Sequence, residues 1–276
     1  MSLKAMYNKI AGSYKTADLF GSITESHACA LKQILASGQA KHKNLHILDL
    51  GVGDAAFIKK LAPYFPKGIY TGIDISVNML ASAKENFPQL ITIEGSSANA
   101  SNNIPSHTQD LVVAHFLNAY LPMHDLFNEV NLLLAPYGFF SYITTTYDSF
   151  PVAQQSLAKF IDSRSLWAQV VGHYYKSIVK NTMVVANLTS LLKAFNDHNF
   201  DIINHQRLEL PILLHNINEL EHFGVEGTWF LNAMDINVRL LPKALVMRKM
   251  RQLLAKIITF PYKDTHVIDV VLAKKR

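Results

Sequence analysis

The hydrophobic positions in the first half of the chain fall into five short apolar runs, separated by segments with helical spacing. The runs cover residues 46–50, 68–74, 89–95, 110–116 and 139–145. Continuous apolar character, without polar alternation, is typical of strands that are buried on both faces of a parallel sheet. The pattern therefore predicts an open, doubly wound α/β sheet covered by helices on both sides.

Helices are expected between these strands and before the first of them. Residues 24–38 carry apolar residues at helical spacing, with Thr24 as a candidate cap and Gly38 as the end of the helix. Residues 136–138, Pro-Tyr-Gly, predict a turn before the fifth strand. The other expected helices cover residues 55–65, 76–86, 124–134, one or two stretches within 151–180, and a segment that begins near Asn187.

Two further strands are predicted at residues 200–210 and 265–275. We expect them to lie next to each other at one edge of the sheet. The predicted architecture is then a seven-stranded sheet, mostly parallel, with an antiparallel closing strand and helical insertions.

Composition narrows the class of protein. The chain has 276 residues, of which 49% are hydrophobic, and this is enough for a single large domain over residues 1–276 with a helical cap at 1–40. A single cysteine excludes an intrachain disulfide and a thiolate metal site. No apolar run approaches the roughly 18 residues of a membrane span, and the first residues lack the core of a secretory signal. These features favour a cytoplasmic protein.

The most informative stretch is HILDLGVGDAAF, residues 46–57, where a strand ends in two closely spaced glycines. In an open α/β sheet, ligands bind at the carboxyl ends of the strands, and the first strand–helix turn lies there. Gly51 and Gly53 permit positive φ and place no Cβ between the backbone and a ligand. Asp74 ends the next strand, where a carboxylate can accept hydrogen bonds from ribose hydroxyls. The turn is therefore expected to hold a nucleoside.

Two nucleoside cofactors compete for this turn. Residues 51–56 match the dinucleotide glycine pattern loosely, which leaves an NAD-type oxidoreductase as an alternative. Asp49 stands two residues before the first glycine, where its carboxylate would repel a pyrophosphate and attract an ammonium or sulfonium group. Together with Asp54 it favours S-adenosylmethionine, which carries both of these positive groups.

The motifs around this turn resemble those of the class I S-adenosylmethionine-dependent methyltransferases. They read LDLGVGDAA, YTGIDISVNML, DLVVAHFLNAYLP and a PYG where the family often has PGG. The opening MYNKIAGSY is similar to that of small-molecule members, such as the ubiquinone/menaquinone, malonyl-carrier and trans-aconitate methyltransferases. The resemblance implies a Rossmann-like fold, S-adenosyl-L-methionine as cofactor, and a small organic acceptor.

The resemblance also implies a set of cofactor-binding residues. Ile75 matches the apolar residue beside the adenine. Tyr14 is a candidate for closing over the methionine end, and His115 is a candidate for contact with the cofactor. Ser96 and Ser97 stand where many relatives have an aspartate for the adenine amino group, and a serine hydroxyl would accept that bond more weakly. The full expected set is Tyr14, Asp49, Gly51, Gly53, Asp74, Ile75, Ser96, Ser97 and His115.

The catalytic residue stays open. Methyl transfer from a sulfonium needs mainly alignment; a hydroxyl acceptor benefits from a base, whereas a carboxylate acceptor needs none. His115 and Tyr147 are the candidates for a catalytic role, and Asn118 and Tyr120 are candidates for contact with the acceptor. The histidines show no metal-ligand pattern with cysteines or clustered carboxylates, so we expect no metal.

Two expected helical insertions, residues 147–182 and 211–262, are rich in aromatic side chains, which favours a lid over an organic acceptor. Additional core or a dimer interface stays an alternative, and the oligomeric state is open. Residues 241–260 are predicted to form a basic amphipathic helix with a solvated face, or with weak contact to an anionic membrane or carrier. A nucleic-acid partner is disfavoured because no nucleic-acid-binding module is recognisable.

The sequence thus predicts S-adenosylmethionine-dependent methyl transfer to a small organic acceptor, at a carboxyl or hydroxyl oxygen. The alternatives are the NAD-type oxidoreductase, which Asp49 disfavours, and a non-catalytic cofactor-binding protein that acts through its basic C-terminal helix.

Overall fold

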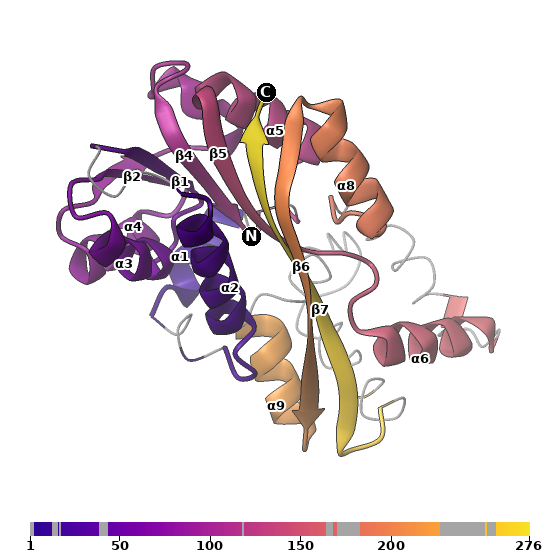
Figure 1. Cartoon of the computed structure of the whole chain (residues 1–276). Helices are drawn as coiled ribbons and strands as arrows, with labels where there is room; N and C mark the ends of the chain where they lie inside the picture. Colours follow the sequence, from indigo (N-terminus) through magenta and orange to yellow (C-terminus); the bar gives the residue numbers. More distant parts are fainter. Residues whose placement is uncertain are drawn as a thin grey trace.

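The chain folds around a seven-stranded sheet with the strand order β3-β2-β1-β4-β5-β7-β6 (Figure 1). This computed structural model describes residues 3–12, 16, 18–38, 44–117, 119–163, 168–169, 183–226, 252 and 258–276. β1 to β5 are parallel to one another, and β7 is antiparallel to both β5 and β6. The strands are β1 His46–Leu50, β2 Ile69–Asp74, β3 Ile91–Glu94, β4 Gln109–His115, β5 Leu134–Thr145, β6 Phe200–Leu214 and β7 Tyr262–Lys275. The predicted mostly parallel sheet with an antiparallel closing strand is confirmed.

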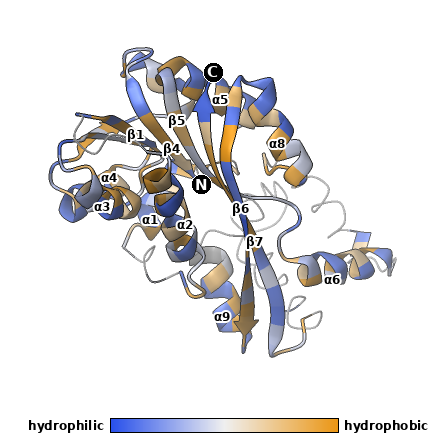
Figure 2. Cartoon of the chain, in the orientation of Figure 1, coloured by the Kyte–Doolittle hydropathy of each residue, from blue (hydrophilic) through white to orange (hydrophobic). Residues whose placement is uncertain are grey.

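Helices cover both faces of this sheet. Helices α2, α3 and α4 pack on one face, and α5 and α8 pack on the other. Helices α2, α5 and α8 mix hydrophobic and hydrophilic positions (Figure 2), as expected for helices that bury one side. Among the described residues, no helix is long and apolar enough to cross a membrane. The helices are α1 Leu3–Ile10, α2 Ser22–Ala36, α3 Ala56–Leu61, α4 Val77–Asn86, α5 Met123–Leu133, α6 Pro151–Asp162, α8 Leu188–Asp197 and α9 Ile217–Glu221, with short 3-10 turns at Ala62–Tyr64 and Ser97–Asn102.

The alternation of side chains along each strand divides the core into two layers. On β1, Ile47 faces the layer under α2 and α3, whereas Leu48 and Leu50 face the layer under α5 and α8. All three are completely buried. Asp49 has the parity of Ile47, so its carboxyl group belongs to the face that α2 and α3 cover. A charged residue at this position interrupts an otherwise apolar layer.

The start of α2 differs from the prediction. The helix begins at Ser22, and Thr24 lies in its first turn, so Thr24 is not the cap. The Asp18 carboxylate accepts hydrogen bonds from the backbone N–H groups of Ile23 and Thr24, both at 3.0 Å. A carboxylate offers two oxygens to the unpaired N–H groups of a helix start, and here it takes the role expected of a hydroxyl. The predicted end is confirmed, because Gly38 follows the helix with φ +75°.

The expected turn at residues 136–138 is also different. β5 begins directly after α5, at Leu134, which pairs with Gln109 of β4. The register shifts between Gln109 and Leu111, and Tyr137 adopts φ 64°. The Pro-Tyr-Gly signal therefore marks an irregularity inside a strand and not a chain reversal.

The β6–β7 ribbon is longer than predicted. β5 pairs with β7 only as far as Ile268, but β6 and β7 continue to the pair Leu214 and Tyr262 (Figure 1). The expected helical insertion is wrong at residues 211–214 and 262, which are strand. Antiparallel pairing satisfies the backbone hydrogen bonds of these residues. A separate small hydrophobic core stabilises the extension and contains Ile212, Leu214, Leu220, Phe223 and Tyr262. Residues 170–182 and 227–251 lie outside the described residues, so the lid and the basic helix at 241–260 stay predictions.

Candidate functional site

The glycine turn after β1 is held against β2. The N–H groups of Gly51 and Val52 both donate to the Ile73 carbonyl, at 2.8 and 3.0 Å. Gly51 and Gly53 have φ +71° and +53°. A Cβ added to Gly51 would lie 2.4 Å from Leu117 Cδ2, whereas a Cβ on Gly53 would meet nothing within 4 Å. Gly51 thus packs closely against Leu117 in the segment after β4, and Gly53 borders open space that a ligand can use.

Asp74 connects the end of β2 to this turn. Its Oδ2 accepts from the Gly53 N–H at 3.0 Å, and its Oδ1 accepts from the Ser76 N–H at 2.8 Å. Burial raises the pKa of Asp74, and hydrogen bonds from the backbone of Ser76, Gly53 and Ile75 offset part of that rise. Ser76 caps α4, because its Oγ accepts from the Met79 N–H at 3.1 Å. A carboxylate has about four acceptor sites, so Asp74 retains capacity to accept from a ligand hydroxyl.

Two more carboxyl groups surround the turn. Asp49 is buried, and burial raises its pKa well above the ordinary value, with further increases from Asp74 and then Asp54. Asp54 is also buried and accepts from the Ala56 N–H at 3.1 Å. Within the described part of the chain, no side chain or backbone donor contacts the Asp49 carboxyl group and no cation pairs with Asp49 or Asp74. This arrangement is unfavourable by itself and becomes favourable when a positive ligand enters.

His115 ends β4 on the same side of the sheet as Asp49. Its Nε2 lies 3.1 Å from Ser141 Oγ, and its ring lies 4.5 Å from Phe57 and 5.2 Å from His27, measured between ring centroids. Burial lowers the pKa of His115 well below its ordinary value, and His27 lowers it further. The imidazole is therefore neutral near pH 7. Sequence reasoning missed His27, because nothing local distinguishes it from a packed histidine of an amphipathic helix.

The remaining expected cofactor residues are placed unevenly. Ile75 follows β2 beside Asp74 and is half-buried. Ser96 caps the 3-10 turn, with its Oγ accepting from the Ala98 N–H at 3.2 Å, and Ser97 is buried. Tyr14 and Asn118 lie outside the described residues. The adenine-side contact predicted for Ser96 therefore competes with its capping role.

Helix α1 reaches the same edge from the N-terminus. Asn8 Oδ1 accepts from Ser76 Oγ at 2.7 Å, and Asn78 Nδ2 donates to the Asn8 carbonyl at 2.9 Å. Lys4 forms an ion pair with Glu94 at the end of β3. Tyr7 meets Tyr120 edge-on at 5.8 Å between ring centroids. The contacts of α1 thus extend from β2 and β3 to the segment after β4, next to the glycine turn.

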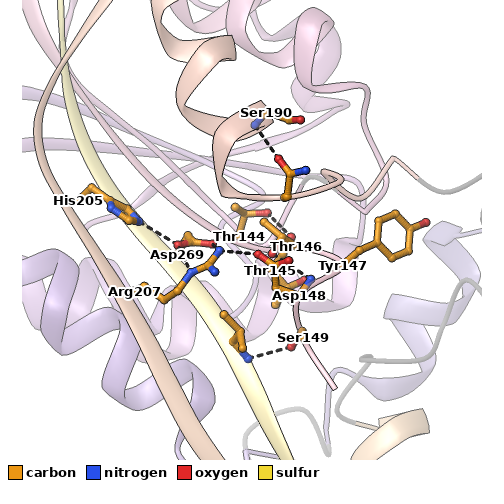
Figure 3. Close-up of polar contacts among 12 residues, drawn as sticks. Thr144, Thr145, Thr146, Tyr147, Asp148, Ser149, Ser190, His205, Arg207 and Asp269 are labelled. Atoms are coloured by element: carbon orange, nitrogen blue, oxygen red, sulfur yellow. Dashed lines mark hydrogen bonds and ion pairs between the residues drawn. The ribbon is translucent and has the colours of Figure 1, made fainter. Parts of the chain in front are cut away.

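A second polar group lies in the middle of β6 and β7, beside the end of β5 (Figure 3). Asp269 is completely buried and accepts from Arg207 Nε at 3.0 Å and Arg207 Nη2 at 2.8 Å, with His205 Nε2 at 2.8 Å. Arg207 Nη2 also pairs with Asp148 at 2.9 Å. The hydrogen bonds to Asp269 raise the pKa of Arg207. This group joins β6 and β7 to the segment after β5, and no motif in the sequence indicates it.

Tyr147 follows β5 directly. Its N–H donates to the Val185 carbonyl at 3.1 Å, which ties the segment after β5 to the residues before α8. In Figure 3 its side chain points away from Asp269 and Arg207. The structure therefore separates Tyr147 from the ion-paired group next to it. In the described ranges, no three or more His, Cys, Asp or Glu side chains are arranged to hold a metal ion.

Comparison with known proteins identifies the domain that carries this site. A family model described as a methyltransferase domain matches residues 47–138, which contain β1 to β4, the glycine turn, Asp74 and His115. Over residues 47–138 the chain carries a class I S-adenosylmethionine-dependent methyltransferase domain. S-adenosylmethionine is the cofactor of this class. The acids around the glycine turn of the methyltransferase domain fit this cofactor, because it brings the positive charge that the described residues do not supply.

Other proteins match this chain in part of its sequence or in its fold. Trans-aconitate 2-methyltransferase of Acidovorax sp. strain JS42 is 28% identical over 129 residues, which are 46% of this chain and 48% of that protein. The chain thus matches about half the length of such curated relatives. The YcgJ protein of Bacillus subtilis has a TM-score of 0.56 at 14% identity, covering 90% of this chain and 99% of its own. Geranyl diphosphate C-methyltransferase of Streptomyces coelicolor A3(2), solved with S-adenosyl-L-homocysteine, has a TM-score of 0.50 at 13% identity, covering 90% and 79%. These two likenesses support the fold.

Proposed function

We propose that this chain transfers the methyl group of S-adenosylmethionine to an oxygen of a small organic acceptor, a carboxyl or a hydroxyl group. The observation that carries the proposal is the set of three buried acids at the glycine turn, Asp49, Asp54 and Asp74. Among the described residues, no cation balances Asp49 or Asp74. A cofactor with a sulfonium and an ammonium group would supply that balance, whereas a pyrophosphate would add repulsion.

The residues of the turn divide the binding of the cofactor between them. Asp74 would accept the two ribose hydroxyls with the lone pairs that Gly53 and Ser76 leave free. Gly53 would allow the backbone to approach the ligand, and Ile75 would lie beside the adenine. Asp49 would face the positively charged end. Tyr14, Ser96, Ser97 and His115 complete the proposed set.

Bound S-adenosylmethionine supplies an already activated methyl group, so the protein's own task is alignment of the acceptor and exclusion of water. His115 is neutral and anchored to Ser141, so it is suited to take the proton of a hydroxyl acceptor. The similarity to trans-aconitate methyltransferases favours the alternative, a carboxyl acceptor, which needs no base. Residues 147–182 and 211–262 are proposed to cover the acceptor.

The test is a calorimetric titration of the full chain with S-adenosylmethionine, S-adenosyl-L-homocysteine and NAD⁺. We expect the first two ligands to bind and NAD⁺ to give no heat of binding. Release of S-adenosyl-L-homocysteine is then followed with a panel of acceptors that includes trans-aconitate. Binding of NAD⁺ in preference to S-adenosylmethionine would overturn the proposal in favour of an oxidoreductase. Tight cofactor binding without turnover of any acceptor would favour a non-catalytic protein.

A further inference from the structure

Two buried imidazoles meet between helix α2 and strand β4. The ring centroids of His27 and His115 lie 5.2 Å apart with an interplanar angle of 38°, and Phe57 packs against both rings. The Nδ1 atom of each ring is buried, and no described residue supplies a hydrogen-bond partner for either atom. His27 itself is 7% exposed, whereas His115, at the end of β4, remains partly accessible. Two nitrogens without a described hydrogen-bond partner therefore lie together at the end of β4.

Buried nitrogens without a hydrogen-bond partner make the folded chain less stable. A buried polar atom without a partner loses its hydrogen bonds to water and gains nothing in return. The surrounding layer contains Ile143, Val113 and Phe57, and apolar side chains at positions 27 and 115 would fit this layer without that cost. Only one nitrogen of the pair has a described partner, His115 Nε2 with Ser141 Oγ at 3.1 Å. The two Nδ1 atoms therefore gain a hydrogen bond only when a polar group of a ligand reaches them.

The placement of the pair points to the acceptor. Asp49 of β1 and Ser141 of β5 are both in register with Val113 of β4, and His115 follows Val113 on the same face. The imidazoles therefore lie along the same face of the sheet as Asp49, one or two strands away from the glycine turn. A group bound between them would be close to the positively charged end of the cofactor, where the acceptor belongs.

The charge state of the pair limits what it can bind. Burial lowers the pKa of His27 to about 3, with a smaller effect from Lys60, and burial lowers the pKa of His115 as well. Each neutral ring has one N–H donor and one acceptor nitrogen. A hydroxyl group both donates and accepts, so a single oxygen at about 2.8–3.0 Å from each ring matches both imidazoles. A carboxylate would have to lose its hydration against two uncharged rings, which is far more costly.

We propose that His27 and His115 together bind the hydroxyl group of the acceptor, so that the substrate is an alcohol, phenol or enol and not a carboxylic acid. This inference rests on the proposed function, and it assigns to His27 a role that no motif indicates. The two rings hold the acceptor oxygen from two sides, with His115 fixed by Ser141 and His27 fixed by helix α2.

The test uses the ring nitrogens as reporters in ¹⁵N NMR of the full chain saturated with S-adenosyl-L-homocysteine. Phenol, benzoate and toluene are matched probes that share one ring and differ in the attached group. We expect phenol to shift the Nδ1 resonances of His27 and His115, and benzoate and toluene to leave both unchanged. An equal or larger effect of benzoate, or no effect of phenol, overturns the proposal. A titration without S-adenosyl-L-homocysteine repeats the measurement, so that failure of cofactor binding does not hide the response of the imidazoles.

Two substitutions at one position separate binding from packing. An asparagine amide lies near the position of Nδ1, whereas a glutamine amide lies near Nε2. We expect His27→Gln to weaken phenol binding about fivefold and His27→Asn to weaken it less. His124→Gln, at an exposed histidine of α5, is the matched control and should bind phenol like the unmodified chain. Equal phenol affinity of all three variants would show that His27 only fills space, and melting temperatures confirm that each variant is folded.

Discussion

Buried carboxyl groups occur in two regions of this molecule, and their surroundings are opposite. At the β6–β7 ribbon, Asp269 is completely buried but accepts two hydrogen bonds from Arg207 and lies 2.8 Å from His205. At the glycine turn, Asp49 is almost as deeply buried, and no described donor or cation contacts it. Both lie near the carboxyl edge of one sheet. The difference lies in what balances the charge.

The comparison separates a structural charge from a ligand-binding one. A carboxylate that is paired inside the protein fixes the strands around it and gains little from a further ligand. Burial raises the pKa of a carboxyl group that has no partner, and the charged form makes the folded chain less stable until a cationic ligand binds beside it. On this reasoning we propose that Asp49 and Asp74, which no described cation balances, bind the cofactor, whereas Asp269 stabilises the ribbon.

The largest expected effect comes from removing the counter-ion of Asp269. Arg207→Met leaves a buried carboxylate with His205 alone, and we expect a loss of about 3–5 kcal/mol in the free energy of unfolding. Urea denaturation measures this loss. Arg276→Met is the control, because the Arg276–Asp201 pair is exposed and should contribute under ~1 kcal/mol. If Arg207→Met with Asp269→Leu is no more stable than Arg207→Met alone, the charge balance at Asp269 is not what holds the ribbon.

Substitution of Asp74, the proposed acceptor for the ribose hydroxyls, should produce the next largest effect. Asp74→Ala loses two charge-assisted hydrogen bonds to the ribose, so we expect S-adenosylmethionine affinity to fall on the order of 100-fold. Asp74→Asn retains one acceptor oxygen and should lose less. Both variants also lose an acceptor for the Gly53 or Ser76 N–H groups, so their melting temperatures are measured in parallel. Near-normal affinity in a less stable Asp74→Ala protein would assign Asp74 to structure alone.

Asp49 is expected to favour binding of S-adenosylmethionine, whose sulfur is positively charged, over S-adenosyl-L-homocysteine, whose sulfur is neutral. S-adenosyl-L-homocysteine differs from S-adenosylmethionine by the sulfonium methyl group, so the ratio of the two affinities isolates the attraction of that positive charge. We expect Asp49→Asn to reduce S-adenosylmethionine affinity roughly tenfold more than S-adenosyl-L-homocysteine affinity. Calorimetry of both ligands on both proteins measures the ratio. An unchanged ratio would mean that Asp49 does not face the sulfonium.

The raised pKa of Asp49 also predicts a pH dependence. The folded chain holds the carboxyl proton at pH values where the unfolded chain, with the ordinary value of 3.8, has released it. The contribution of Asp49 to stability therefore falls as the pH rises from that value through the raised pKa, and it stays low above it. Asp49→Asn should remove this dependence and make the ligand-free protein more stable at neutral pH. Melting temperatures of both proteins across the acidic range test the sign.

The smallest effect is expected from a single methyl group at the turn. Gly53 and Gly38 both have positive φ, and an added Cβ meets nothing within 4 Å at either position. Gly53→Ala and Gly38→Ala should therefore lose similar stability, about 1–2 kcal/mol each. Only Gly53→Ala should weaken S-adenosylmethionine binding, by about tenfold. Equal affinity of the two variants would place the ligand away from Gly53.

The cofactor half of the site could be read from the sequence because its parts are local. Gly51, Gly53 and Asp74 lie at the ends of two consecutive strands, and a parallel βαβ unit brings those ends together by its own geometry. The capping of α4 by Ser76 and the end of α2 at Gly38 are likewise decided within a few residues. The structure differs from these predictions in details. Asp18, and not Thr24, accepts hydrogen bonds at the start of α2, and Leu117 packs next to Gly51.

The ion-paired group at Asp269 and the pair of imidazoles depend on partners that are distant in sequence. Arg207 and Asp269 are 62 positions apart, and His27 and His115 come from a helix and a strand that no motif relates. The extension of β6 to Leu214 required β7 beside it, because an unpaired strand leaves its backbone groups without partners.

The sequence by itself determined the order of strands and helices, the glycine turn and the acids that surround it. Periodicity records which side of each element is buried, and glycines and caps record the local backbone. Only the tertiary structure decided which buried carboxyl group has a counter-ion, which imidazoles meet, and how far the ribbon extends. Those outcomes depend on which strands become neighbours and on how much water is excluded between them, and no single segment of the chain carries that information.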